Sequence, residues 1–143
     1  MPHENPESSV STRDIRIFND SYARCNSRPD FLNRFYEIFF TSSEKAAKKF
    51  EHTDVEKQAA ILKSSLHMMA LSASGNPEGK EHMEGLAERH SRRDLDIEPE
   101  FYDVWLDCLV KTVEEFDPRF DENIGKAWRK VMKPGIDFMK SRY

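Results

Sequence analysis

The chain has 143 residues, which is enough for one domain with a single sizeable core and short for two domains. Aromatic residues make up 11% and charged residues 34% of it, which favours a globular domain and excludes a disordered chain. The formal net charge is -4, with basic residues scattered among acidic ones, so nucleic acid is not an expected partner. No segment approaches the roughly 18 apolar residues of a membrane span, and no targeting leader is visible. We therefore expect no membrane partner and a cytoplasmic location.

The spacing of apolar residues predicts an all-α chain, and the presence of only five glycines agrees with it. Residues 1–10 are expected to form a disordered lead-in, because they offer little to bury, and residues 11–143 a single domain. Ser11 opens a motif like a capping box at the start of the first helix. Pro29 is expected at the first position of a second, aromatic helix, and a short third helix ends near Phe50. The apolar residues expected on one face of each of the first two helices are Ile15, Phe18, Tyr22, Cys25, Leu32, Phe35, Tyr36 and Phe39.

The second half of the chain predicts four more helices. A capping box over residues 53–56 is expected to begin a long helix, which ends at a turn over residues 74–79. A shorter helix follows and carries His90 on an otherwise apolar stripe. Pro99 begins the next helix, and residues 121–141 form the last one.

Five histidines raise the question of a metal site. Their spacing lacks the His-x-x-x-His pair of helical zinc sites and the Glu-x-x-His motif of di-iron bundles, and no nucleophile or phosphate-loop motif is present. His90 remains, either as an ordinary buried histidine or as a ligand. Leu86 lies one helical turn earlier, so its carbonyl can accept the Nδ1 proton and leave Nε2 free for a metal. Arg92 and Arg93 then either form a solvated helix end or provide cations for carboxylates at a pocket rim.

Four sequence landmarks in this order resemble those of the single-domain bacterial haemoglobins and the globin portion of flavohaemoglobins. They are Phe35-Tyr36, Phe50, the segment from Leu86 to His90, and Ala127-Trp128. The resemblance implies the globin fold, with helices A, B, C, E, F, G and H packed around a haem pocket. It also implies haem b (iron protoporphyrin IX) as the cofactor.

The same resemblance implies a role for individual residues. His90 would be the proximal iron ligand, Phe50 would pack on the porphyrin, and Tyr36 would be the distal hydrogen-bond donor. Gln58 is the candidate for the distal position of helix E, because its amide can donate to bound O2. The remaining candidate cofactor-binding residues are Phe39, Leu62, Leu66, Leu86 and Arg89. Trp105 and Trp128 are assigned to the core.

The register of helix E stays open, because the stretch from Phe50 to Gln58 is shorter than in the relatives. In a shifted register Ala59 or Ala60 would face the iron, and Tyr36 would be the only polar distal group. Lys63 falls where the family has a small buried residue, so it would reach the pocket rim or the helix would be rotated. His67 is a further alternative, as an internal sixth ligand.

Three functions compete. The first is a haem protein that reversibly binds O2, CO or NO, for oxygen binding, scavenging or gas sensing. The second is an NO dioxygenase or peroxidase-like enzyme that depends on an external reductase. The third is a haem-free regulatory module that keeps the globin fold and binds a partner. The sequence does not distinguish a monomer from a homodimer.

Overall fold

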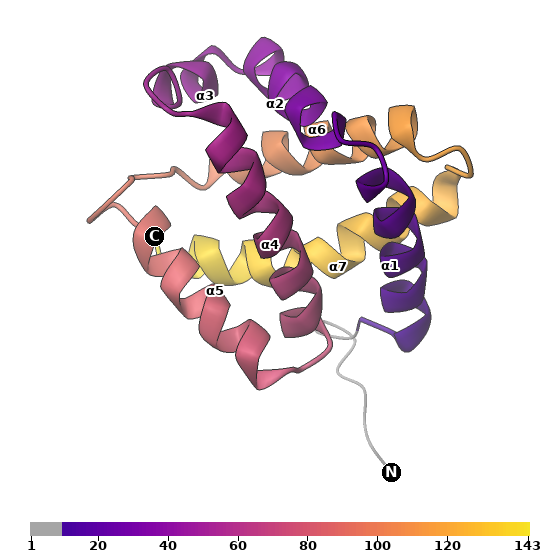
Figure 1. Ribbon diagram of the computed structural model, residues 1–143. Coiled ribbons are helices and arrows are strands. Elements are labelled where there is room, and N and C mark those ends of the chain that lie inside the picture. Colours follow the sequence, from indigo (N-terminus) through magenta and orange to yellow (C-terminus); the bar gives the residue numbers. More distant parts are fainter. Residues whose placement is uncertain (1–9) are drawn as a thin grey trace.

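The computed structural model describes residues 10–143, which form seven α-helices and no strand (Figure 1). The predicted all-α class is therefore confirmed. The predicted lead-in falls mostly outside the described residues, and Val10 is partly buried against the core. Between residues 10 and 143, every helix is too short or too polar to span a bilayer. The helices are α1 (Thr12–Asn26), α2 (Phe31–Ser42), α3 (Glu44–Lys49), α4 (Val55–Ala73), α5 (Pro77–His90), α6 (Glu100–Phe116) and α7 (Glu122–Ser141).

Local capping explains where most helices begin. The predicted box at α1 is present: the Ser11 hydroxyl accepts from the backbone N–H of Asp14, whose carboxylate accepts from the backbone N–H of Ser11. The hydroxyl of Ser43 accepts from the backbone N–H of Ala46 at the start of α3. The carboxylate of Asp121 caps α7 in the same way.

Three predicted helix starts are wrong by one or two residues, at α2, α4 and α6. Helix α6 begins at Glu100, directly after Pro99. Pro29 lies in the turn before α2, which begins only after Asp30. At α4 the cap is Asp54, whose carboxylate accepts from two backbone N–H groups. Thr53 belongs to the preceding turn, in which its backbone N–H donates to the carbonyl of Phe50.

The predicted turn over residues 74–79 is shorter than expected. The amide oxygen of Asn76 accepts from the backbone N–H groups of Glu78 and Gly79, and Pro77 occupies the first helical position. Gly75, with φ of +89°, makes the reversal after α4. Gly79 therefore lies inside α5 rather than in the loop.

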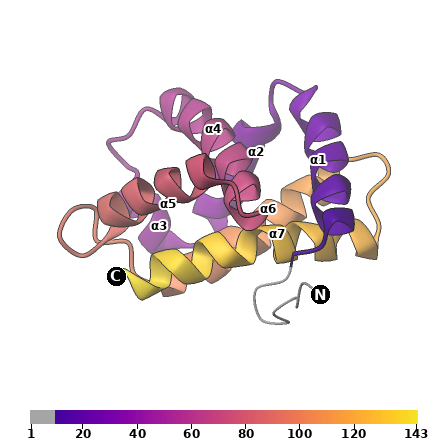
Figure 2. The same ribbon diagram turned by 90° about the horizontal axis from the view of Figure 1, so that it is seen from below.

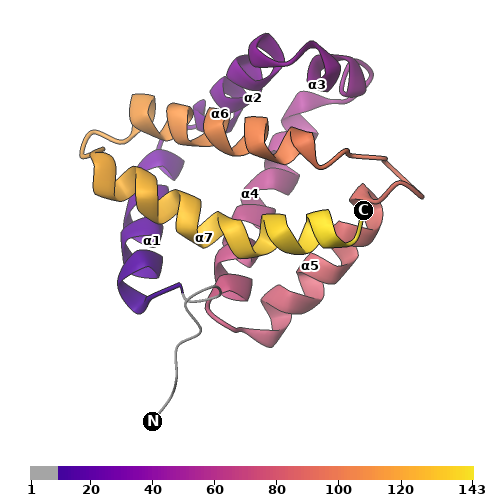
Figure 3. The ribbon, with the colours of Figure 1, turned by 180° about the vertical axis from the view of Figure 1, so that it is seen from behind.

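The helices form two crossed layers. Seen from behind, α6 and α7 run side by side across the molecule (Figure 3). Over them, α2 packs on α6, and α1 and α4 pack on α7. Seen from below, α5 lies along α7 and beside α4 (Figure 2). Apolar faces from both layers meet in one core, in which Trp128 of α7 is fully buried against Phe18 of α1.

The closed end of the α4–α5 hairpin depends on Gly79. A Cβ atom at this position would lie 2.3 Å from the backbone nitrogen of Ser72 and 2.8 Å from the carbonyl carbon of Leu71. Backbone atoms cannot move aside as the end of a flexible side chain can. The backbones of α4 and α5 therefore come so close at this point that only glycine fits there.

We expect Gly79→Ala to lower the free energy of unfolding by about 1–3 kcal/mol, because the new methyl group forces α5 away from α4. Gly85→Ala is the matched control on the same helix, since a Cβ atom there meets nothing within 4 Å. It should raise stability by up to about 1 kcal/mol through helix propensity. Urea unfolding measures both, and equal effects of the two substitutions would refute the close-approach account.

A buried polar network joins α1 to the end of α6 and to α7. The Trp128 indole N–H donates to the Ser21 hydroxyl (2.9 Å), which donates to the Asp117 carboxylate (2.6 Å). Arg24 donates to the same carboxylate from Nε (2.7 Å) and from a terminal nitrogen. Burial by itself would raise the pKa of Asp117, but these hydrogen bonds and one from the backbone of Arg119 outweigh it and hold the pKa below the usual value.

Asp117→Asn should lower the free energy of unfolding by about 2 kcal/mol at pH 7, since it leaves Arg24 without its counter-charge. The folded-state pKa is depressed, so the contribution of the carboxylate is complete above its unfolded pKa of about 4 and disappears as the pH falls through the folded value. The gap between wild type and variant should therefore close on acidification. Asp107→Asn, which removes an exposed ion pair with Arg129, is the control and should cost under about 1 kcal/mol. A difference in the free energy of unfolding between wild type and Asp117→Asn that did not change with pH would contradict the role given to the Asp117 carboxylate.

Candidate functional site

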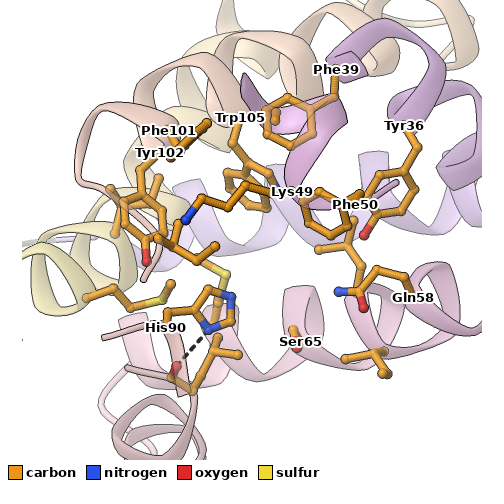
Figure 4. Close-up of a pocket in the computed structure, with 18 residues that line it drawn as sticks. Tyr36, Phe39, Lys49, Phe50, Gln58, Ser65, His90, Phe101, Tyr102 and Trp105 are labelled. Atoms are coloured by element: carbon orange, nitrogen blue, oxygen red, sulfur yellow. Dashed lines mark hydrogen bonds between the residues drawn. The ribbon is translucent and has the colours of Figure 1, made fainter. Parts of the chain in front are cut away.

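A cavity lies between α2, α3, α4, α5, α6 and α7, and its walls are mainly aromatic and aliphatic (Figure 4). It reaches the surface beside Ile61, which is 48% exposed. The lining residues are Tyr36, Phe39, Ala46, Lys49, Phe50, Gln58, Ile61, Leu62, Ser65, Met69, Leu86, His90, Ile97, Phe101, Tyr102, Trp105, Ile136 and Met139. An apolar cavity with a few convergent polar groups is the usual form of a small-molecule site.

His90 stands at the end of α5, with its ring orientation set by one hydrogen bond. Its Nδ1 lies 2.8 Å from the carbonyl oxygen of Leu86. A carbonyl can only accept, so Nδ1 carries the proton and Nε2 is the basic nitrogen. Nε2 has no hydrogen-bond partner among residues 10–143, and it faces the cavity in Figure 4. The predicted bond between Leu86 and His90 is confirmed.

The environment of His90 favours the neutral imidazole. Burial lowers the pKa of the ring, because the imidazolium would lose its hydration. The hydrogen bond to the Leu86 carbonyl opposes this shift, and the positive charge of Arg89 adds to it. A neutral ring with a free Nε2 is the form that binds a metal ion.

Tyr36 of α2 and Gln58 of α4 form the polar part of the opposite wall. Figure 4 shows the Tyr36 hydroxyl directed toward the Gln58 amide. Burial raises the pKa of Tyr36, and the interaction with Gln58 opposes that rise. The phenol therefore keeps its proton at physiological pH and acts as a hydrogen-bond donor.

The face of α4 that borders the cavity is the one that carries Gln58. Gln58 and Leu62 line the cavity, whereas Ala59 and Ala60 do not. Ala60 instead lines a surface groove between α4 and α1, together with Lys63 and His67. Lys63 therefore does not reach the cavity rim, and His67 lies outside the cavity, where it cannot serve as an internal ligand from this position.

An aromatic wall covers the side of the cavity next to Tyr36. The ring centroids of Tyr36 and Phe50 are 6.0 Å apart, and those of Phe39 and Phe50 6.4 Å. Trp105 of α6 packs against the core, as predicted, and in addition lines the cavity, which was not predicted. Helix α6 places Trp105 at the edge of the core. Its ring packs on Phe35, with the ring centroids 6.0 Å apart, and also borders the cavity.

Two predicted cofactor-binding residues do not reach the cavity. Leu66 lies on a face of α4 that is fully buried in the core. Arg89 is exposed, because its position on α5 points away from the stripe that carries His90. Arg92 is also engaged elsewhere: its guanidinium stacks on the Tyr143 ring at 4.7 Å and donates to the Tyr143 carbonyl.

Several lining residues were missed from the sequence, namely Ala46, Lys49, Ile61, Ser65, Ile97, Phe101, Tyr102, Ile136 and Met139. Most come from the loop before α6 and from α6 and α7, whose broad apolar faces gave no sign of which residues would border a cavity. Tyr102 is 6% exposed, its hydroxyl has no hydrogen-bond partner among the described residues, and burial raises its pKa. Lys49 had one available signal, its position directly before Phe50.

Comparison with known proteins gives consistent results. The model of the Globin family matches residues 33–138, more than half of the chain. The crystal structure of the protein PA3967 from Pseudomonas aeruginosa PAO1, described as structurally highly homologous to a human hemoglobin, superposes with a TM-score of 0.86. The two sequences are 37% identical over 91% of this chain and 98% of that chain. No curated protein matches the sequence.

Proposed function

The chain belongs to the globin family, and on this premise we propose that it holds haem b in the cavity and reversibly binds O2, CO or NO there. The predicted globin fold is confirmed, with the seven helices occupying in chain order the places of helices A, B, C, E, F, G and H. The functional proposal rests on how this chain's own side chains are arranged in the cavity.

The observation that carries the proposal is the orientation of His90. Its Nδ1 proton is committed to the Leu86 carbonyl, and its neutral Nε2 faces an apolar cavity. Haem needs only one such nitrogen from a globin, because the porphyrin supplies the other four ligands, and when bound it supplies an iron that takes up diatomic gases. The hydrogen bond to the carbonyl also prevents the ring from turning and makes Nε2 more basic.

The walls of the cavity fit a flat apolar group of this kind. Phe50 and Phe39 provide aromatic surface on one side, and Leu86 and Leu62 provide aliphatic surface. Apolar walls of this kind disfavour water next to a bound group. A dry, apolar pocket supports reversible gas binding, because it limits the access of water and protons.

Tyr36 and Gln58 set the polarity of the space where a gas ligand would lie. Both are hydrogen-bond donors in a region of low dielectric, where a bond to a ligand with partial negative charge is strong. Such donors favour O2 over CO, which carries less charge. They also slow the release of O2, so scavenging or sensing suits this pocket better than delivery.

The primary test is the absorption spectrum of the protein reconstituted with haem. Wild type should show a Soret band and histidine coordination, and His90→Ala should lose the coordination and bind haem at least about tenfold more weakly. The matched control is His67→Ala, which removes an exposed histidine of α4 outside the cavity and should leave the spectrum unchanged. A wild type that stays colourless after haem supplementation would refute the proposal.

The distal donors have a separate test. Tyr36→Phe should raise the O2 dissociation rate of the haem-reconstituted protein by about tenfold, equivalent to about 1.4 kcal/mol, and change CO dissociation much less. Stopped-flow displacement of O2 by CO gives the rate.

Tyr22→Phe serves as the control, since its hydroxyl donates to the Lys63 carbonyl (2.8 Å) outside the cavity. If Tyr36→Phe and Tyr22→Phe release O2 at the same rate, the distal role of Tyr36 is wrong. Gln58→Leu tests the second donor in the same assay.

A further inference from the structure

Lys49 crosses the edge of the cavity. It is the last residue of α3, directly before Phe50, and its side chain lines the cavity although the residue is exposed. Its ammonium donates to the carbonyl oxygens of Leu95 and Asp96, in the loop that follows His90. Figure 4 shows the chain reaching from the Phe50 side toward Phe101, whose ring centroid lies 5.9 Å from Nζ.

The positive charge of Lys49 has no counter-charge among residues 10–143. Its two partners are neutral carbonyls, and an ammonium has three donors, so one remains unused. No carboxylate lies within ion-pair distance of it among these residues, although nine ion pairs of Lys or Arg form elsewhere in the same part of the chain. The adjacent carboxylate of Asp96 accepts from the Tyr143 hydroxyl at 2.5 Å.

The predicted rim cations do not occupy this position. Neither Arg93 nor Lys63 lines the cavity, and Arg92 is held against Tyr143. Lys49 is the cationic side chain among the cavity-lining residues, which are otherwise apolar, aromatic or uncharged. A ligand with an apolar body and an acidic edge would place its carboxylate here, because a charge-assisted bond is stronger than a bond to a carbonyl.

We propose that Lys49 selects a ligand that carries a carboxylate at the edge of its apolar body. The assignment rests on the proposed function and extends it, since it names the group recognised: a propionate of the porphyrin. Lys49 contacts that carboxylate with the unused donor, or in place of one loop carbonyl.

The test uses metal-free protoporphyrin IX and its dimethyl ester, which differ only in the two carboxylates. Dissociation constants are measured for the full chain from porphyrin fluorescence and from quenching of Trp105, which lines the cavity. The informative variant is Lys49→Gln, because its amide can still donate to the loop carbonyls but carries no charge. Lys48→Gln is the matched control, an exposed neighbour that does not line the cavity.

Wild type and Lys48→Gln should prefer the acid to the ester by the same factor, and Lys49→Gln should reduce that factor by about fivefold. Lys49→Arg should retain most of the preference, and 0.5 M salt should weaken it in wild type. A preference unchanged in Lys49→Gln, or reduced equally in Lys48→Gln, would overturn the assignment. Circular dichroism of each variant verifies that it is folded.

The result is distinguishable from failure of the haem proposal. A metal-free porphyrin has no iron for Nε2 to bind, so the acid-to-ester comparison does not depend on coordination by His90. If iron protoporphyrin showed no histidine coordination, the haem proposal would fail while the Lys49 comparison could still be read. Failure of the wild type to bind the metal-free acid would overturn the Lys49 assignment.

Discussion

The contact between α4 and α5 at Gly79 is the constraint from which the cavity follows. A Cβ atom there would lie 2.3 Å from a backbone nitrogen, so the two helices touch main chain to main chain at the closed end of their hairpin. The cavity lies toward the opposite end, where Gln58 lies near the start of α4 and His90 ends α5. Tight packing at one end of the pair and a cavity at the other place these two side chains on facing walls.

Within the cavity, polar groups are few, and each has a defined state. The His90 ring is neutral because burial lowers its pKa, and the carbonyl of Leu86 determines which nitrogen faces inward. Tyr36 stays protonated because burial raises its pKa. The charge of Lys49 lies at the edge, where its ammonium meets loop carbonyls rather than the apolar interior. The hydrogen-bond donor Tyr36, the free nitrogen of His90 and the cation Lys49 thus occupy separate places. The charge lies at the edge because burying an ammonium in surroundings of low dielectric constant costs free energy.

The helices were largely predictable because their signals are local. Spacings of three and four and residues such as Ser11 and Asp121 determine a helix from its own segment. The errors at Pro29 and Thr53 are also local in origin: each residue belongs to the preceding turn, and at α4 the carboxylate of Asp54 caps the helix instead. Gly79 shows what local signals do not reveal. It lies inside α5 because Asn76 caps that helix, and a glycine is required there because the backbone of α4 is so close.

By itself, the sequence determined the helical class, the position of His90 on an apolar stripe and its bond to the Leu86 carbonyl, because these depend on residues within one or two helical turns. Tertiary structure alone decided that Gln58 rather than Ala59 or Ala60 lines the cavity, and that Leu66 and Arg89 do not. A rotation of one residue about a helix axis moves a side chain by about 100°, which the broad apolar face of α4 does not specify. Only packing against the neighbouring helices selects the rotation.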